Sequence, residues 1–152
     1  MRELVIGFLI ALFVSSYMAS GGPTPYQNGW TFGNTTIGPD PITEVNAGTF
    51  QGEVLDSHTP VLVEFYTQTD SHCENMKPAV TQLASESQGF LRVVKIDAEA
   101  SGNSAITRRY DISSFPSFVL IKDGKAVNGT SGEMAKKELE NWVKRELDIP
   151  VT

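Results

Sequence analysis

A short polar stretch after an apolar run carries the side chains that could do chemistry. Asp70, His72 and Cys73 lie within four positions of one another, and Glu64 lies inside the preceding apolar run. A thiolate can attack a disulfide, while histidine and carboxylate groups can move protons. Cys73 is the only cysteine of the chain, so it cannot form a disulfide within one chain. Thiol chemistry here would use one sulfur, or a second sulfur from a partner.

Two interpretations of this stretch remain open. In the first, it only begins a helix: Ser71 is the N-cap and Glu74, three positions later, completes a capping box. In the second, the unpaired N–H groups of the first helical turn and a protonated His72 favour the thiolate of Cys73. The carboxylate of Asp70 opposes that effect, so the direction of the net pKa change is not fixed by the sequence.

Glu64 is a second candidate for proton transfer. It stands in the middle of Val-Leu-Val-Glu-Phe-Tyr at 61–66, a run typical of a strand buried on both faces. A carboxylate is costly to bury unless it is used or hydrogen-bonded, so Glu64 is either a base toward Cys73 or is satisfied by water or hydroxyl groups. The catalytic candidates are thus Cys73, Glu64 and His72.

A metal site is the weaker use of the same residues. Asp70, His72 and Cys73, with His58 as a fourth, have suitable ligand types, but their spacing matches no closed zinc pattern. We therefore expect no metal and no other cofactor.

The elements that must position these residues follow from hydrophobic periodicity. The pattern predicts the order α-β-α-β-α-β-β-α: a short helix within 42–58, a strand at 61–66, a helix from 71, a strand at 91–96, a short helix at 103–110, strands at 118–122 and 126–128, and a helix at about 133–147. Asp123-Gly124 joins the last two strands as a tight hairpin. Alternating strands and helices predict an α/β fold with a mainly parallel sheet that is covered on both faces and has an antiparallel hairpin at one edge.

The first 41 residues are expected to lie outside this domain. Residues 1–21 combine an apolar run with small residues, Ala19-Ser20-Gly21, at a possible cleavage site, which predicts a signal peptide. An uncleaved N-terminal membrane anchor is the alternative. Residues 22–41 are rich in Gly and Pro and predict a flexible linker. The domain would then span 42–148, and the protein would be secreted or periplasmic, or anchored in the membrane and facing the exported side.

The overall composition limits the partners. The net charge is −6 at pH 7, which argues against nucleic acid and anionic lipid, because both are bound through basic surfaces. Contact with a membrane is expected only if the N-terminal segment is not cleaved. Asn34-Thr35-Thr36 and Asn128-Gly129-Thr130 are N-glycosylation acceptors if the host modifies exported chains.

Five landmarks in order resemble the thioredoxin family. They are the strand at 61–66, Pro78 inside the following helix, the loop at 112–117 that contains Phe115-Pro116, the Lys122-Asp123-Gly124-Lys125 hairpin, and Gly132 before the last helix. The resemblance implies a thioredoxin fold, a three-layer α/β/α arrangement with a central mixed sheet and a C-terminal antiparallel hairpin. It also implies that Glu64 stands at the position of the family's buried acid and that the Phe115–Pro116 bond is cis.

The resemblance fails at the family's signature, Trp-Cys-x-x-Cys. That signature aligns with 69–73, so Asp70 replaces the attacking cysteine and Cys73 matches the resolving one. The family's dithiol cycle needs both sulfurs and cannot be carried over. We therefore expect a module that binds a protein or an extended peptide through Asp70, Ser71, Phe115 and Pro116. Monothiol exchange, or glutathione or peroxide chemistry at Cys73, is the alternative, and a lasting intermolecular disulfide through Cys73 is a third possibility.

Overall fold

The computed structural model describes residues 31–32, 35–36 and 40–149. The chain divides into two compact units, residues 1–39 and 40–152. In the first, strand β1 (Thr31–Phe32) pairs antiparallel with β2 (Thr35–Thr36), although no strand is predicted there. The predicted signal peptide and most of the predicted linker lie outside the described residues. In the described part of the chain, no helix is both long enough and apolar enough to cross a membrane.

The second unit contains the predicted elements and one more. They are β3 (Thr43–Glu44), the π-helix η1 (Gln51–Leu55), β4 (Val61–Tyr66), α2 (Ser71–Glu86), β5 (Arg92–Asp97), α3 (Ser104–Arg109), β6 (Ser117–Lys122), β7 (Lys125–Ser131) and α4 (Lys136–Glu146). The addition is β3, whose two residues are too few to show a strand period. It is held by parallel pairing with β5.

The strands form one mixed sheet in the order β3-β5-β4-β6-β7. The central strand, β4, is parallel to β5 and antiparallel to β6, and β6 and β7 form the predicted hairpin. In the turn of the β6–β7 hairpin, φ is 51° at Asp123 and 72° at Gly124. A Cβ at Gly124 would lie 3.0 Å from the carbonyl oxygen of Leu55. Positive φ and the close approach together explain the glycine.

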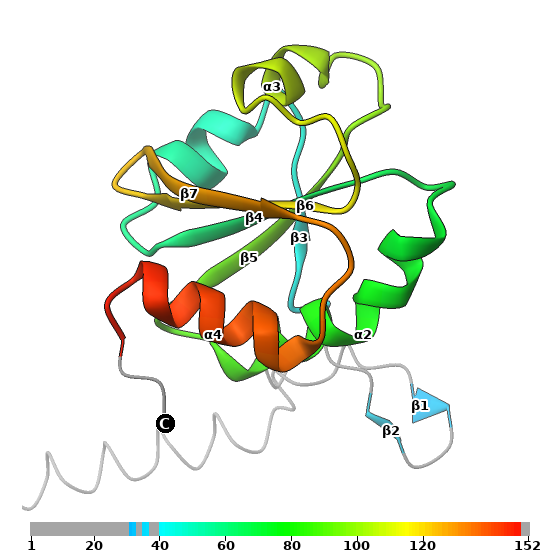
Figure 1. Ribbon diagram of the computed structural model, residues 1–152, viewed down its shortest axis with the longest axis vertical. Coiled ribbons are helices and arrows are strands. Elements are labelled where there is room, and N and C mark those ends of the chain that lie inside the picture. Colours follow the sequence, from blue (N-terminus) through cyan, green and yellow to red (C-terminus); the bar gives the residue numbers. More distant parts are fainter. Residues whose placement is uncertain (1–30, 33–34, 37–39, 150–152) are drawn as a thin grey trace, which may run out of the picture. The chain divides into compact units, whose positions relative to one another are not determined.

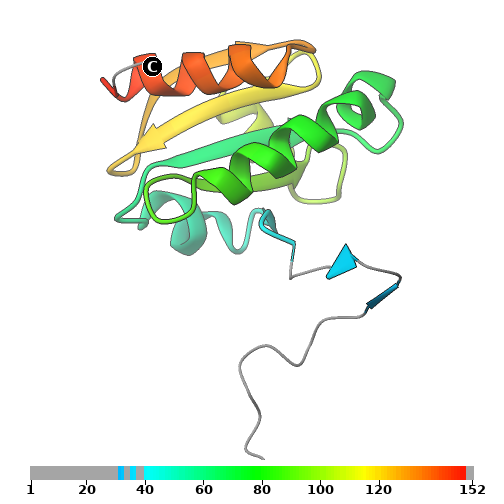
Figure 2. The same ribbon diagram turned by 90° about the horizontal axis from the view of Figure 1, so that it is seen from below.

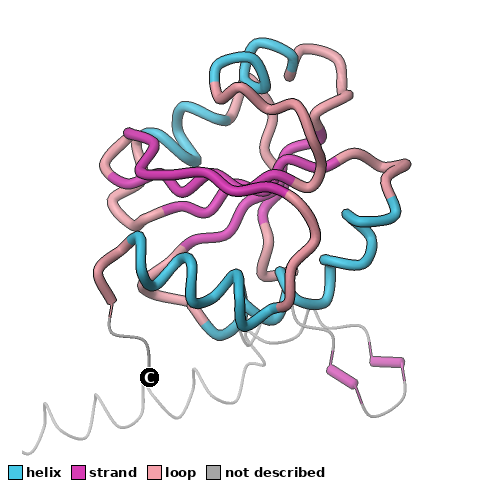
Figure 3. The backbone as a smooth tube through the Cα atoms, in the orientation of Figure 1, coloured by secondary structure: helices cyan, strands magenta, loops and turns pink. Residues whose placement is uncertain are grey.

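Helices cover both faces of the sheet, which gives the three-layer thioredoxin fold. Helices α2 and α4 lie on one face, and η1 and α3 lie on the other (Figures 1 and 2). The same layers are visible in the tube view, where the strands run between the two sets of helices (Figure 3). The expected fold class is confirmed.

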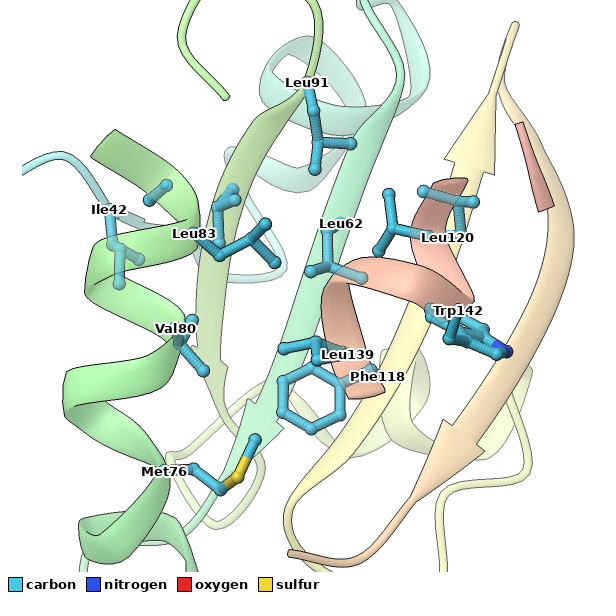
Figure 4. Close-up of a cluster of buried hydrophobic side chains, with 13 residues drawn as sticks. Ile42, Leu62, Met76, Val80, Leu83, Leu91, Phe118, Leu120, Leu139 and Trp142 are labelled. Atoms are coloured by element: carbon cyan, nitrogen blue, oxygen red, sulfur yellow. The ribbon is translucent and has the colours of Figure 1, made fainter. Parts of the chain in front are cut away.

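Each face of the sheet has its own apolar core. On the α2/α4 side, Met76, Val80 and Leu83 of α2 pack with Leu62 of β4 and with the side chains of α4 (Figure 4). On the other side, Phe65 of β4 belongs to the cluster that packs under η1 and α3. Successive residues of a strand face opposite sides, so Glu64 shares the face of Leu62 and lies on the side of α2.

Candidate functional site

The helix that carries the cysteine begins with an aspartate cap. Asp70 has extended backbone angles, and its carboxylate accepts a 2.8 Å hydrogen bond from the backbone N–H of His72. Ser71 is therefore the first helical residue rather than the N-cap, and the predicted capping box is wrong. Glu74 instead forms an ion pair with Lys77 at 2.6 Å. The cap comes one residue earlier because the Asp70 carboxylate already accepts the hydrogen bond of a free N–H group in the first turn, that of His72.

Cys73 lies in the first turn of α2 and is buried. Its residue is 2% exposed. Burial is the main cause that raises the pKa of its thiol, and the negative charges of Asp70, Glu64 and Glu74 raise it further. A hydrogen bond with the backbone of Thr67 acts in the opposite direction but is the smaller effect. The sequence did not fix the direction of the pKa change at Cys73, and the structure shows that the pKa is raised. A raised pKa leaves less thiolate, so Cys73 is disfavoured as a nucleophile.

Glu64 is buried at the centre of the sheet, as predicted. It is 5% exposed, and burial raises its pKa from 4.5 to about 7, although the charges of Lys95 and Lys77 lower it. Among the described residues no hydrogen-bond partner of its carboxyl group is found. A carboxyl group with a pKa near neutrality can take up or release a proton at physiological pH.

Glu64 and Cys73 line the same cavity, which has a volume of about 540 Å³. The cavity lies between β4, β5 and α2, and its other walls include Ile42, Tyr66 and Lys95. The structure therefore brings two of the three catalytic candidates together, and it joins them to a space that could hold a small molecule or water.

His72 has a different neighbour. Its Nδ1 lies 2.8 Å from Oε2 of Glu133, in the loop before α4, and both side chains are largely exposed. Asn75 donates a 3.2 Å hydrogen bond to the same oxygen. The hydrogen bond with Glu133 is the main cause that raises the pKa of His72, followed by the charge of Asp70. Neither Glu133 nor Asn75 was predicted from the sequence, in which Gly132 was the only nearby signal.

The loop at 132–134 links the predicted binding residues. The N–H of Gly132 donates a 2.8 Å hydrogen bond to the carbonyl oxygen of Pro116, and the N–H of Met134 contacts Sδ of Met76 at 3.3 Å. Together with the Glu133–His72 contact, these bonds tie the Pro116 loop to the start of α2 through one short segment. We call the surface formed by 70–72 and 132–133, which lies over the buried Pro116, the loop face.

The predicted binding residues differ in accessibility. Ser71 is exposed and Asp70 is half-buried, whereas Pro116 is buried. Phe115 is half-buried and packs against the cluster under η1 and α3. The Phe115–Pro116 peptide bond is cis. Side chains that a partner could contact therefore come mainly from the start of α2 and from Glu133.

No metal centre is assembled in the described ranges. There, no three histidine, cysteine, aspartate or glutamate side chains are grouped so that they could hold a metal ion. The ligand types noted in the sequence are separated because His72 turns to Glu133, Asp70 caps the helix and Cys73 is buried.

The fold and this site define a class of protein: a thioredoxin-fold domain with a single thiol at the start of the helix that follows the central strand. The family model described as thioredoxin matches residues 41–145, and the chain belongs to the thioredoxin family. It is 32% identical over 104 residues to "Thioredoxin 1" of a Nostoc species, and the aligned residues cover 68% of this chain and 95% of that protein. "Thioredoxin X, chloroplastic" of Arabidopsis thaliana is 35% identical over 104 residues, covering 67% of this chain and 56% of that protein.

Proposed function

We propose that this protein is an exported member of the family that binds a protein or an extended peptide and does not carry out dithiol turnover. The observation that carries the proposal is the state of Cys73, the chain's one thiol, which is 2% exposed and has a raised pKa. Where the chain is aligned with the family's Cys-x-x-Cys signature, Asp70 stands in place of the attacking cysteine. A substrate disulfide at this position would therefore find no thiolate to attack it. Loss of the nucleophile leaves the scaffold able to bind without exchange.

The loop face is the proposed binding surface. Its support is the set of bonds through which the segment at 132–134 fastens the Pro116 loop to the start of α2. A surface that is held in place before binding loses less conformational entropy when a partner docks. Exposed Ser71, His72 and Glu133 offer polar contacts to a backbone, which suits an extended peptide.

Insulin reduction with dithiothreitol tests the absence of turnover. The wild type is expected to give the rate of dithiothreitol alone, and clear acceleration would refute the proposal. Reduced and carboxymethylated α-lactalbumin, an unfolded chain without thiols, serves as the probe for binding. Ser71→Arg should weaken its binding, whereas Ser85→Arg, exposed further along the same helix, should not.

Monothiol oxidoreductase chemistry is the second candidate. It is favoured by the cavity that Cys73 and Glu64 share, and by the relatives, which are named thioredoxins. In this mechanism Glu64 takes the thiol proton, and the thiolate attacks glutathione disulfide or a partner disulfide, which forms a mixed disulfide and releases the other sulfur as a thiol. With hydrogen peroxide the thiolate instead forms a sulfenic acid and water is released. The folded protein is incubated with glutathione disulfide, and mass spectrometry records whether Cys73 gains a glutathione group. Formation of this mixed disulfide would support the mechanism, and a thiol that stays unmodified for hours would exclude it.

A lasting intermolecular disulfide requires the Cys73 sulfur to come to the surface. The burial of Cys73 opposes that. Non-reducing electrophoresis of the native protein is expected to show a monomer, and a dimer that disappears on reduction would establish the bond.

Export is proposed from residues 1–21 alone. N-terminal sequencing of the protein recovered from the exported compartment is expected to begin just after the Ala19-Ser20-Gly21 segment. A membrane-bound protein that retains Met1 would instead identify an anchor.

A further inference from the structure

The cavity beside Glu64 is the feature of the domain that peptide binding at the loop face leaves unused. It measures about 540 Å³, which lies in the range of small-molecule sites. It is partly open to solvent through exposed residues such as Glu74 and Lys77. It therefore has room for an occupant and a route by which one could enter.

Three carboxylates and two ammonium groups line the cavity, which leaves one negative charge. The two lysines each face a carboxylate at the surface: Lys77 lies 2.6 Å from Glu74, and Lys95 lies 3.9 Å from Asp40. The remaining carboxylate is Glu64, which is 5% exposed. Oδ1 of Asn141 is the one fully enclosed side-chain oxygen or nitrogen without a partner among the described residues, so the oxygens of Glu64 are not sealed off and can be reached from the cavity.

A carboxylate that is so little exposed is poorly solvated, and a ligand that donates hydrogen bonds to it offsets that cost. A cationic donor does so best, because charge-assisted hydrogen bonds are the stronger ones. An anionic ligand would place like charge beside Glu64. A metal ion would need further ligands, and none are grouped in the described part of the domain.

The rest of the lining indicates the body of the ligand. Ile42 supplies a buried aliphatic surface and Tyr66 supplies an aromatic ring. The hydroxyl group of Tyr66 is already bonded to Glu44 at 2.9 Å, and Nζ of Lys95 lies over its ring, 5.9 Å from the centre, so the part of the ring that Lys95 does not cover remains for contact. An apolar body beside a cationic head is complementary to these walls.

We propose that this cavity binds a small organic cation, a primary amine with an apolar body, with its ammonium group on the carboxylate of Glu64. The proposal concerns a surface different from the loop face and stands or falls independently of peptide binding. Cys73 lines the same cavity, so a bound amine would also lie against the thiol and restrict access to it.

Benzylamine is the probe, and benzyl alcohol is its neutral counterpart of similar shape. At pH 8 we expect benzylamine to bind the full-length protein with a Kd on the order of 1 mM, as suits so small a ligand. It should shift the amide resonances of Cys73 and Lys95 and slow the alkylation of Cys73. Benzyl alcohol should bind at least tenfold more weakly.

Glu64→Gln is the decisive variant and should weaken benzylamine binding at least tenfold. Glu99→Gln, which alters an exposed carboxylate outside the cavity lining, should change the Kd less than threefold. Wild-type binding should also fall about thirtyfold from pH 8 to pH 5.5, because the Glu64 carboxyl group, with a pKa of about 7, is mostly ionised at the first pH and mostly protonated at the second. The other charged groups that line the cavity are Lys95, Lys77, Asp40 and Glu74.

Three results would overturn the proposal: no binding of benzylamine to the wild type, equal binding of benzyl alcohol, or unchanged binding to folded Glu64→Gln. Far-ultraviolet circular dichroism establishes that the variant is folded. The first result would show that the cavity does not take such a ligand, and the other two would show that binding does not depend on an ion pair with Glu64.

Discussion

Glu64→Gln is expected to stabilise the protein, and more strongly as the pH rises. Glutamine keeps the size and polarity of the side chain but cannot ionise. The wild-type carboxyl group is buried in the middle of β4, and its pKa is raised from 4.5 to about 7, mainly by that burial. In the pH range between these values the folded state keeps a proton that the unfolded state has lost.

The sign and size follow from proton linkage. Because the folded state binds more protons between pH 4.5 and 7, the free energy of unfolding of the wild type falls as the pH rises through this range. The full loss is about 3 kcal/mol, at about 1.4 kcal/mol for each unit of pKa. Most of it occurs above pH 5, so the advantage of Glu64→Gln should grow by about 2 to 3 kcal/mol between pH 5 and pH 8.

Urea denaturation at pH 5 and pH 8 measures this difference directly. Glu74→Gln is the matched control: it removes an exposed carboxylate on α2 and should change stability by less than about 1 kcal/mol at either pH. If Glu64→Gln is equally or less stable than the wild type at pH 8, the folded carboxylate is satisfied by interactions that the described residues do not include. Burial of the Glu64 carboxyl group would then carry no net cost to stability.

Four further predictions concern the start of α2 and the core. Asp70→Cys should restore the Cys-x-x-Cys pair and give insulin reduction above the dithiothreitol background, while Asp70→Ala, which removes the cap, should cost about 1 kcal/mol and Asp70→Asn much less. Alkylation of Cys73 against pH should show an apparent pKa above the ordinary thiol value, and the same thiol in urea should return to that value. The pKa of His72, measured by NMR, should be raised and should fall in Glu133→Gln. Leu139→Ala, at a fully buried position of α4, should cost about 2 to 5 kcal/mol in denaturant.

The sequence was sufficient to predict the fold where periodicity was strong. The run at 61–66 predicted a central strand because no solvent-facing position interrupted it, and the apolar stripe from Met76 to Ala84 predicted the buried face of α2. Strand β3 was missed because two residues cannot show alternation, and its pairing with β5 is a tertiary interaction. Strands β1 and β2 were missed because each of them also has only two residues.

The site was less accessible to sequence reasoning, since its character depends on which side chains meet. Burial of Glu64 followed from its place in the strand, but the pKa direction of Cys73 depended on how closely the surrounding residues enclose its sulfur. His72 was expected to act on Cys73, yet it contacts Glu133, which is 61 positions away in the chain. No local pattern records a contact between the start of one helix and the loop before another.

The retained carboxyl group is informative because binding at the loop face does not require it. If peptide binding were the whole function, Glu64→Gln would bind carboxymethylated α-lactalbumin as well as the wild type does and would be more stable above pH 7. Loss of benzylamine binding in that same stable variant would then assign the carboxyl group to the cavity. Loss of peptide binding would instead show that the cavity and the loop face are coupled through α2, whose first turn carries Cys73 on one side and His72 on the other.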